Sequence, residues 1–99
     1  MKFIIKNNFK ENIYTLIRNT GYHFQDEDKE KNELNFVRPP RGYPRFHLFL
    51  KAEKENLIFN LHLDQKKPIY KGTTAHSGEY EGKIIEEEAE RIKQALNCL

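Results

Sequence analysis

The sequence predicts an α+β fold in which two helices pack on one face of a three- to four-stranded antiparallel sheet, in the order α-β-β-β-α. Three observations predict it. A period-two hydrophobic pattern repeats twice over residues 45–64, helical periodicity appears on both sides of it, and 99 residues suit a single domain, 1–99. Because the helices have one apolar stripe and the sheet one apolar face, a two-layer arrangement covers both.

The hairpin is the clearest element. Every second residue is apolar from Phe46 to Ala52 and again from Leu57 to Leu63. The polar residues 53–56 join the two runs, which is typical of a β-hairpin over 45–64. Matching the apolar faces predicts a register that pairs Leu48 with Leu61. A slip of one residue would turn every apolar side chain to the solvent face.

The first predicted helix covers residues 9–20. Asn8 and Glu11 have the spacing of a capping box, and apolar residues follow at helical spacing up to Gly21, a residue typical of helix ends. The preceding residues 3–5 are either a short strand or an apolar lead-in to this helix.

Strands, loops and a second helix complete the predicted fold. Residues 34–38 alternate as a strand does, and 22–24 can form a short one. The run 26–33 has no apolar member, which predicts an exposed charged loop. Residues 65–82 form a long predicted loop, of a length typical of functional loops. A helix over 83–97 carries an apolar stripe made of Ile85, Ala89, Ile92 and Leu96.

Composition excludes several classes of protein. No segment approaches the roughly 20 apolar residues of a membrane span, and the first residues lack the apolar run of a signal peptide. Cys98 is the only cysteine, so an internal disulfide and a cysteine-based zinc site are both excluded. A lone cysteine favours a reducing compartment. We therefore expect a cytoplasmic protein with no membrane association and no cofactor.

Positive charge is concentrated in two segments, although the net charge is only +2. Residues 34–52 and 66–78 contain basic residues and no acid. If they meet in space they form a basic patch for phosphates; the alternative is ordinary interspersed surface charge. Gly72 and Gly78 also permit backbone N–H groups to point at an anion, although a plain surface loop is as good an interpretation. The candidate nucleic-acid or anion ligands are Arg38, Arg41, Arg45, Lys66, Lys67, Lys71, Thr73, Thr74 and His76.

The predicted register also brings histidines together. It places His47 opposite His62 and Arg45 opposite Asp64, on the face away from the helices. Cross-strand neighbours have Cβ atoms about 4.5–5.5 Å apart, so the two histidines could act as a general acid–base pair. With Asp64 and His76 they could instead hold a zinc ion in a hydrolytic site. The alternative is that both are solvated residues of an amphipathic strand.

A third pattern concerns exposed apolar side chains. Phe49 and Ile58 lie on the otherwise polar face of the hairpin, and Tyr43 lies in the turn before it. Exposed aromatic rings beside arginines can stack nucleic-acid bases. The same residues could form a homodimer or protein-interaction surface, and scattered exposed apolar residues are also normal.

Residues 16–22 end a helix in glycine followed by an aromatic residue, residues 36–38 begin the strands, and a glycine-containing link leads to the strand with His47. This layout resembles the double-stranded-RNA-binding fold and, within it, HicA-type mRNA interferase toxins. The resemblance implies RNA cleavage with a histidine at the position of His47. RNA binding or cleavage is the first hypothesis, and it rests on the two basic segments, the glycine-containing loop and the pair His47 and His62. The alternatives are a metal-dependent hydrolytic site and a non-catalytic interaction module or homodimer.

Overall fold

The computed structural model describes residues 1–65 and 77–97, with side chains of the second segment from residue 82 onward. Its elements confirm the α+β class, but five strands replace the predicted three or four. A strand precedes the first helix, so the predicted order α-β-β-β-α is wrong. In chain order the elements are β1 (Lys2–Lys6), α1 (Ile13–Arg18), β2 (His23–Asp28), β3 (Glu33–Arg38), β4 (Arg45–Glu53), β5 (Asn56–Asp64) and α2 (Ser77–Asn97).

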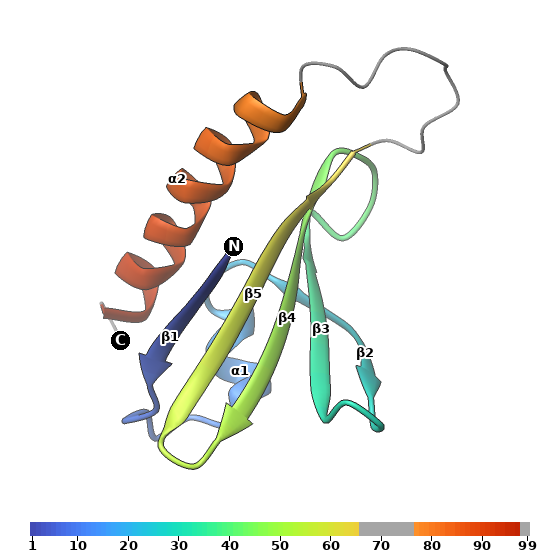
Figure 1. Ribbon diagram of the computed structural model, residues 1–99. Helices are drawn as coiled ribbons and strands as arrows, with labels where there is room; N and C mark the ends of the chain where they lie inside the picture. The colour runs from blue at the N-terminus through green and yellow to red at the C-terminus, as the bar shows by residue number, and fades with distance from the viewer. Residues whose placement is uncertain (66–76, 98–99) are drawn as a thin grey trace.

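The five strands form one antiparallel sheet in the order β1-β5-β4-β3-β2, as Figure 1 shows. The first strand therefore joins the sheet beside the last one. Phe3 pairs with Phe59, and their rings stack with centroids 4.8 Å apart. Residues 3–5 are thus a strand rather than a lead-in to the helix.

The predicted hairpin and its register are confirmed. β4 and β5 pair along their whole length, with Leu48 opposite Leu61 and Arg45 opposite Asp64. The connection is shorter than predicted, because Glu53 and Asn56 still pair with each other. Lys54 turns the chain with a positive φ of 54°, as a tight two-residue connection requires.

The first helix is shorter than the predicted 9–20. It begins after Asn12, whose side-chain oxygen accepts a hydrogen bond of 2.9 Å from the backbone N–H of Thr15. Asn12 is therefore the N-cap, and the spacing of Asn8 and Glu11 was misleading. Phe9 nevertheless packs against the core, so this apolar residue is partly buried although it does not belong to the helix.

Both predicted loops are also shorter than expected. Residues 26–28 continue β2 and Glu33 begins β3, which leaves a turn at 29–32. Paired backbone does not require apolar side chains, and charged side chains are typical of an edge strand such as β2. Within the predicted loop 65–82, residues 77–82 belong to α2; residues 66–76 lie outside the described part of the chain. The second helix therefore begins before the predicted residue 83.

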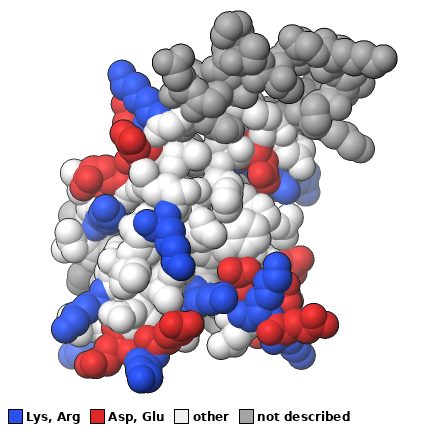
Figure 2. Space-filling view, viewed as in Figure 1, with Lys and Arg blue, Asp and Glu red and all other residues white. Residues whose placement is uncertain are grey.

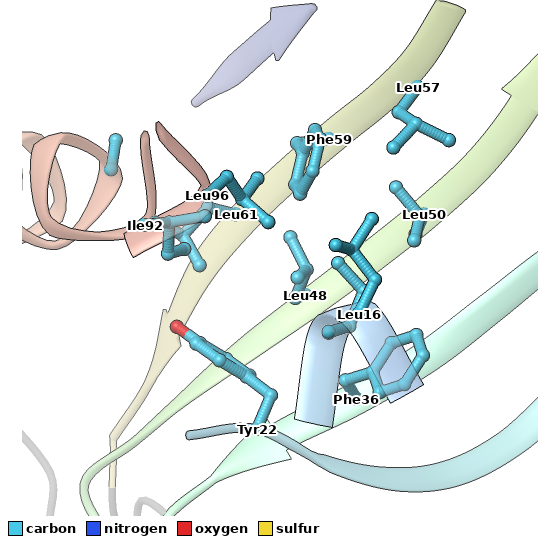
Figure 3. Packing of buried hydrophobic residues seen from close by; sticks show 12 residues of the cluster. Leu16, Tyr22, Phe36, Leu48, Leu50, Leu57, Phe59, Leu61, Ile92 and Leu96 are labelled. Carbon is cyan, nitrogen blue, oxygen red and sulfur yellow. The ribbon is translucent and has the colours of Figure 1, made fainter. Parts of the chain in front are cut away.

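Both helices contribute to one core on one face of the sheet. Leu16 and Ile17 of α1 and Ile92 and Leu96 of α2 belong to the same buried cluster as the inward-facing residues of β3, β4 and β5. Figure 3 shows these side chains converging between the helices and the strands. Neither helix in the described residues combines the length and apolar character of a membrane span.

Candidate nucleic-acid interface on the open sheet face

The sheet face that the helices leave uncovered carries the residues singled out from the sequence. Side chains alternate along each strand, so the confirmed register determines which residues share this face. We call it the open face. Its central members are Arg45, His47, Phe49 and Lys51 of β4, Ile58, Asn60, His62 and Asp64 of β5, Lys2 and Ile4 of β1, and Glu33, Asn35 and Val37 of β3.

Three rings form an aromatic cluster at its centre. The imidazole of His47 stacks on the ring of Phe49, with centroids 4.2 Å apart and an interplanar angle of 21°. His62, directly opposite His47, meets Phe49 edge-on at 5.4 Å. Phe49 therefore contacts both histidines, which the predicted register brought together.

A carboxylate and an arginine adjoin this cluster. His47 Nδ1 lies 3.3 Å from Asp64 Oδ2, and Arg45 Nε lies 3.7 Å from the same oxygen. His47 Nε2 is buried and has no hydrogen-bond partner among the described residues. The tautomer with its proton on Nδ1 fits this arrangement, because Nδ1 then donates to Asp64. The side chain of His47 is only 18% exposed, so it is half-buried rather than a solvated surface group.

Tyr43 extends this group towards the β3–β4 loop. The guanidinium carbon of Arg45 lies 4.8 Å from the centroid of the Tyr43 ring, a cation–π geometry. Tyr43 is 49% exposed. A half-exposed ring and a largely buried arginine, 16% exposed, thus lie beside the aromatic cluster.

Two hollows on the open face meet at Phe49. The first, of about 480 Å³, is lined by His47, Phe49, His62 and Asp64, and extends round the edge of β5 to Leu63 and Ile85. It lies beyond the end of β1, whose pairing with β5 stops at Asn60. The second, of about 240 Å³, lies on the other side of Phe49 and is lined by Lys2, Glu33, Phe49, Lys51, Glu53, Ile58 and Asn60.

The remaining predicted ligands do not join this site. Arg38 points to the helix-covered side of the sheet, where it binds Glu88. Arg41 is exposed in the loop between β3 and β4. The residues Lys66, Lys67, Lys71, Thr73, Thr74 and His76 lie outside the described part of the chain. Whether the basic segments 34–52 and 66–78 meet in space therefore stays a prediction. On the face seen in Figure 2, the two signs of charge are interspersed.

Glu88 is the ionisable residue that the sequence interpretation missed. It is 4% exposed and accepts hydrogen bonds from three side chains. The Tyr22 hydroxyl donates at 2.7 Å, Arg38 donates from Nε and Nη2 at 3.1 and 3.0 Å, and Arg91 donates from the same two atoms at 2.9 Å each. Figure 3 shows the Tyr22 side chain extending towards α2. We call these four residues the Glu88 cluster.

The Glu88 cluster determines the protonation of its members. Burial alone would raise the pKa of the Glu88 carboxyl, but the hydrogen bonds from Arg91, Arg38 and Tyr22 outweigh burial and lower that pKa to about 2. Burial, followed by the negative charge of Glu88, raises the pKa of the Tyr22 hydroxyl well above its ordinary value. The carboxylate is therefore ionised and the phenol neutral throughout the physiological range.

The position of Glu88 in the sequence already indicated that its side chain would be buried. It lies three residues after Ile85 and four before Ile92, on the apolar stripe of α2. An acid on an apolar stripe must find partners when the helix docks, because an unpaired buried charge is costly.

The described residues contain no group of three His, Cys, Asp or Glu side chains arranged to hold a metal ion. The predicted zinc site required His76, which lies outside those residues. Comparisons with protein-family models, with curated proteins and with solved structures find no match. The resemblance to HicA-type toxins accordingly stays a prediction.

Proposed function

We propose that the protein binds single-stranded nucleic acid, with RNA as the expected ligand, through the open face. The observation that carries this proposal is the aromatic cluster of His47, Phe49 and His62 on a sheet face without helices, between two hollows. Aromatic side chains on such a surface stack bases without needing a particular sequence.

Cations flank the cluster at both ends. Arg45 and Tyr43 lie on one side of Phe49, and Lys51 and Lys2 line the hollow on the other. Arg45 and Lys51 are six positions apart along extended β4, a span of about 20 Å. Cations therefore lie on both sides of the stacked base along β4, each beside acids: Asp64 adjoins Arg45, and Glu33 and Glu53 line the hollow with the two lysines.

The geometry favours binding over cleavage. In this conformation His47 Nε2 is buried and Nδ1 faces Asp64, so neither ring nitrogen is open to a substrate. A general base must come within about 2.6–3.2 Å of the proton that it removes. In this proposal His47 supports the aromatic cluster by stacking on Phe49. A catalytic role for His47 and His62 is a separate prediction.

Fluorescence anisotropy with a labelled single-stranded RNA tests the proposal. We expect binding that weakens steeply between low and physiological salt, because phosphate contacts release counterions. Phe49→Ala should weaken it about 5- to 150-fold, since a stacked base contributes about 1–3 kcal/mol. Tyr14→Ala is the matched control, because Tyr14 is an exposed aromatic residue on α1, outside the open face.

Absence of binding at low salt, or equal losses for both variants, would contradict the proposal. The same RNA incubated with wild-type protein and analysed on a denaturing gel tests cleavage independently. If the open face only binds RNA, the RNA should stay intact. Cleavage by the wild-type protein that is lost in His47→Ala would instead support a catalytic role for the histidines.

Self-association is the second candidate, and one observation favours it. Ile4 is 59% exposed and pairs with Ile58, so the open face carries an apolar strip beside Phe49. A second copy would cover that strip. Sedimentation equilibrium at increasing concentration tests it: a wild-type dimer that Ile4→Lys converts to a monomer supports self-association, and a monomer throughout excludes it.

A further inference from the structure

A separate hollow lies on the other side of the sheet, where the helices face it. It measures about 250 Å³ and occupies the end of the sheet next to the β3–β4 loop. Arg38 is its charged residue and Gln65 an uncharged polar one. The other described lining residues are apolar: Pro39, Pro44, Phe46, Leu63 and Ile84.

The register explains why this hollow exists. Arg38, Phe46 and Leu63 form one cross-strand row on the helix-facing side of β3, β4 and β5. The next row, which contains Leu48, is fully buried under the helices, whereas Phe46 and Leu63 are only partly buried. The row of Arg38 therefore lies just beyond the filled core and leaves apolar surface accessible.

Arg38 is held in place at the wall of this hollow. Its Nε and Nη2 donate to Glu88, and its guanidinium carbon lies 5.8 Å from the centroid of the Phe46 ring. Its other terminal nitrogen makes no hydrogen bond to any residue that the structure describes. An arginine already fixed by a carboxylate loses little conformational entropy when its free donor binds a ligand.

The charge of the Glu88 cluster also favours an anion. Arg38 and Arg91 bring two positive charges to the single negative charge of Glu88. Among these three side chains, one positive charge is left over beside an apolar hollow. An anion bound to the free edge of Arg38 would neutralise it through a charge-assisted hydrogen bond.

We propose that this hollow binds a small molecule that joins one aromatic ring to one anionic group, a carboxylate or a phosphate. The ring lies among Pro39, Pro44 and Phe46, and the anionic group binds Arg38. The size fits, because a cavity of about 150 Å³ accommodates benzene and this hollow leaves additional room for the anion. The site lies on the opposite side of the sheet from the aromatic cluster, and it shares Leu63 with the hollow that extends round the edge of β5.

Titration with phenyl phosphate, followed by ¹⁵N–¹H correlation spectra, tests the proposal. We expect saturable shifts at Arg38, Phe46 and Ile84, which line this hollow and not the one on the open face. Inorganic phosphate lacks the ring and benzyl alcohol lacks the charge, so each should bind at least about ten-fold more weakly, as loss of a charge-assisted contact or of ring burial implies. Equal binding of either control, or shifts spread over the open face, would overturn the proposal.

A pair of variants provides the second test. Ile84→Trp fills the hollow and should abolish the saturable shifts, whereas Ile4→Trp makes the same change on the open face and should leave them intact. Undiminished binding by Ile84→Trp would overturn the proposal. The comparison of the three ligands on wild-type protein decides the matter even where Ile84→Trp does not fold.

Discussion

Tyr22 and Glu88, 66 positions apart in the chain, meet in the interior through a hydrogen bond of 2.7 Å from the Tyr22 hydroxyl to Glu88 Oε2. Tyr22 follows α1, and Glu88 lies in α2 on the same side of the sheet. Arg38 of β3 donates to the same carboxylate. A single buried side chain thus links α2 to β3 and to the segment after α1, beside an otherwise apolar core.

Tyr22→Phe removes one donor from Glu88 and keeps the buried ring. We expect the free energy of unfolding to fall by about 1.5–3 kcal/mol, the usual contribution of a hydrogen bond to a charged group. Urea denaturation measures it. Tyr14→Phe is the matched control, because Tyr14 is 47% exposed and its ring contact with Phe24 survives the change. Equal effects of the two changes would contradict a specific role for the Tyr22 hydroxyl.

The low pKa of Glu88 makes stability depend on acid pH. The folded-state pKa is about 2 and the ordinary value is 4.5, so the contribution is complete above about pH 4.5 and is lost as the pH falls towards 2. The shift corresponds to about 3 kcal/mol. Wild-type protein should therefore lose about that much more stability than Glu88→Gln between pH 5 and pH 2, measured by urea unfolding.

The control for that experiment is Glu87→Gln, since Glu87 is exposed on the same helix. It should follow the pH dependence of wild-type protein. At neutral pH, Glu88→Gln itself should be less stable by about 1.5–3 kcal/mol, because it weakens the charge-assisted hydrogen bonds from Arg38 and Arg91, whose side chains are 37% and 39% exposed. A Glu88→Gln protein with the same acid sensitivity as wild type would show that another carboxylate is responsible.

Two features of the structure favour glycine at position 21. Its φ is +102°, and an added Cβ would lie 3.3 Å from Cδ of Arg38. Gly42 also has a positive φ, of +88°, but an added Cβ there meets nothing within 4 Å. Gly42→Ala should cost only the backbone strain, about 1–3 kcal/mol, and Gly21→Ala should cost more. Thermal unfolding of both variants tests this, and an equal loss would mean that Arg38 moves aside freely.

The two faces of the hairpin should respond differently to truncation. Leu48→Ala and Leu61→Ala each remove a fully buried side chain and should cost about 2–5 kcal/mol. The double change His47→Ala with His62→Ala removes the rings around Phe49, which are worth about 0.5–1.5 kcal/mol per aromatic pair, and should leave the protein folded. Severe unfolding by the histidine double variant would contradict the assignment of faces.

The hydrophobic patterns in the sequence correctly predicted the hairpin and the apolar face of α2. The alternation from Phe46 to Leu63 was sufficient for the hairpin, its register and its faces, because a shift of one residue would expose the whole core side. The helical spacing of apolar residues likewise predicted which face of α2 packs against the sheet. The start of the edge strand β2 lies within the short strand considered for 22–24, but its continuation over 26–28 was missed, because exposed charged side chains carry no hydrophobic pattern.

Long-range partners were beyond the reach of sequence patterns. Nothing near residues 3–5 shows that they pair with β5, some fifty residues later. The cap of α1 was misplaced because Asn8 and Asn12 both precede apolar residues, and only tertiary packing selects between them. In the candidate site, the pattern predicted that His47 faces His62, but the stacking on Phe49 and the burial of His47 Nε2 depend on side-chain packing.

The central claim is that the open face binds nucleic acid, and mapping the bound surface tests it most directly. In ¹⁵N–¹H spectra recorded while a single-stranded RNA is added, we predict shifts concentrated at Arg45, His47, Phe49, Lys51 and His62. Residues of α1 on the opposite side, such as Tyr14, should remain unchanged. Shifts confined to the helical side, or none at low salt where phosphate contacts are strongest, would contradict the claim.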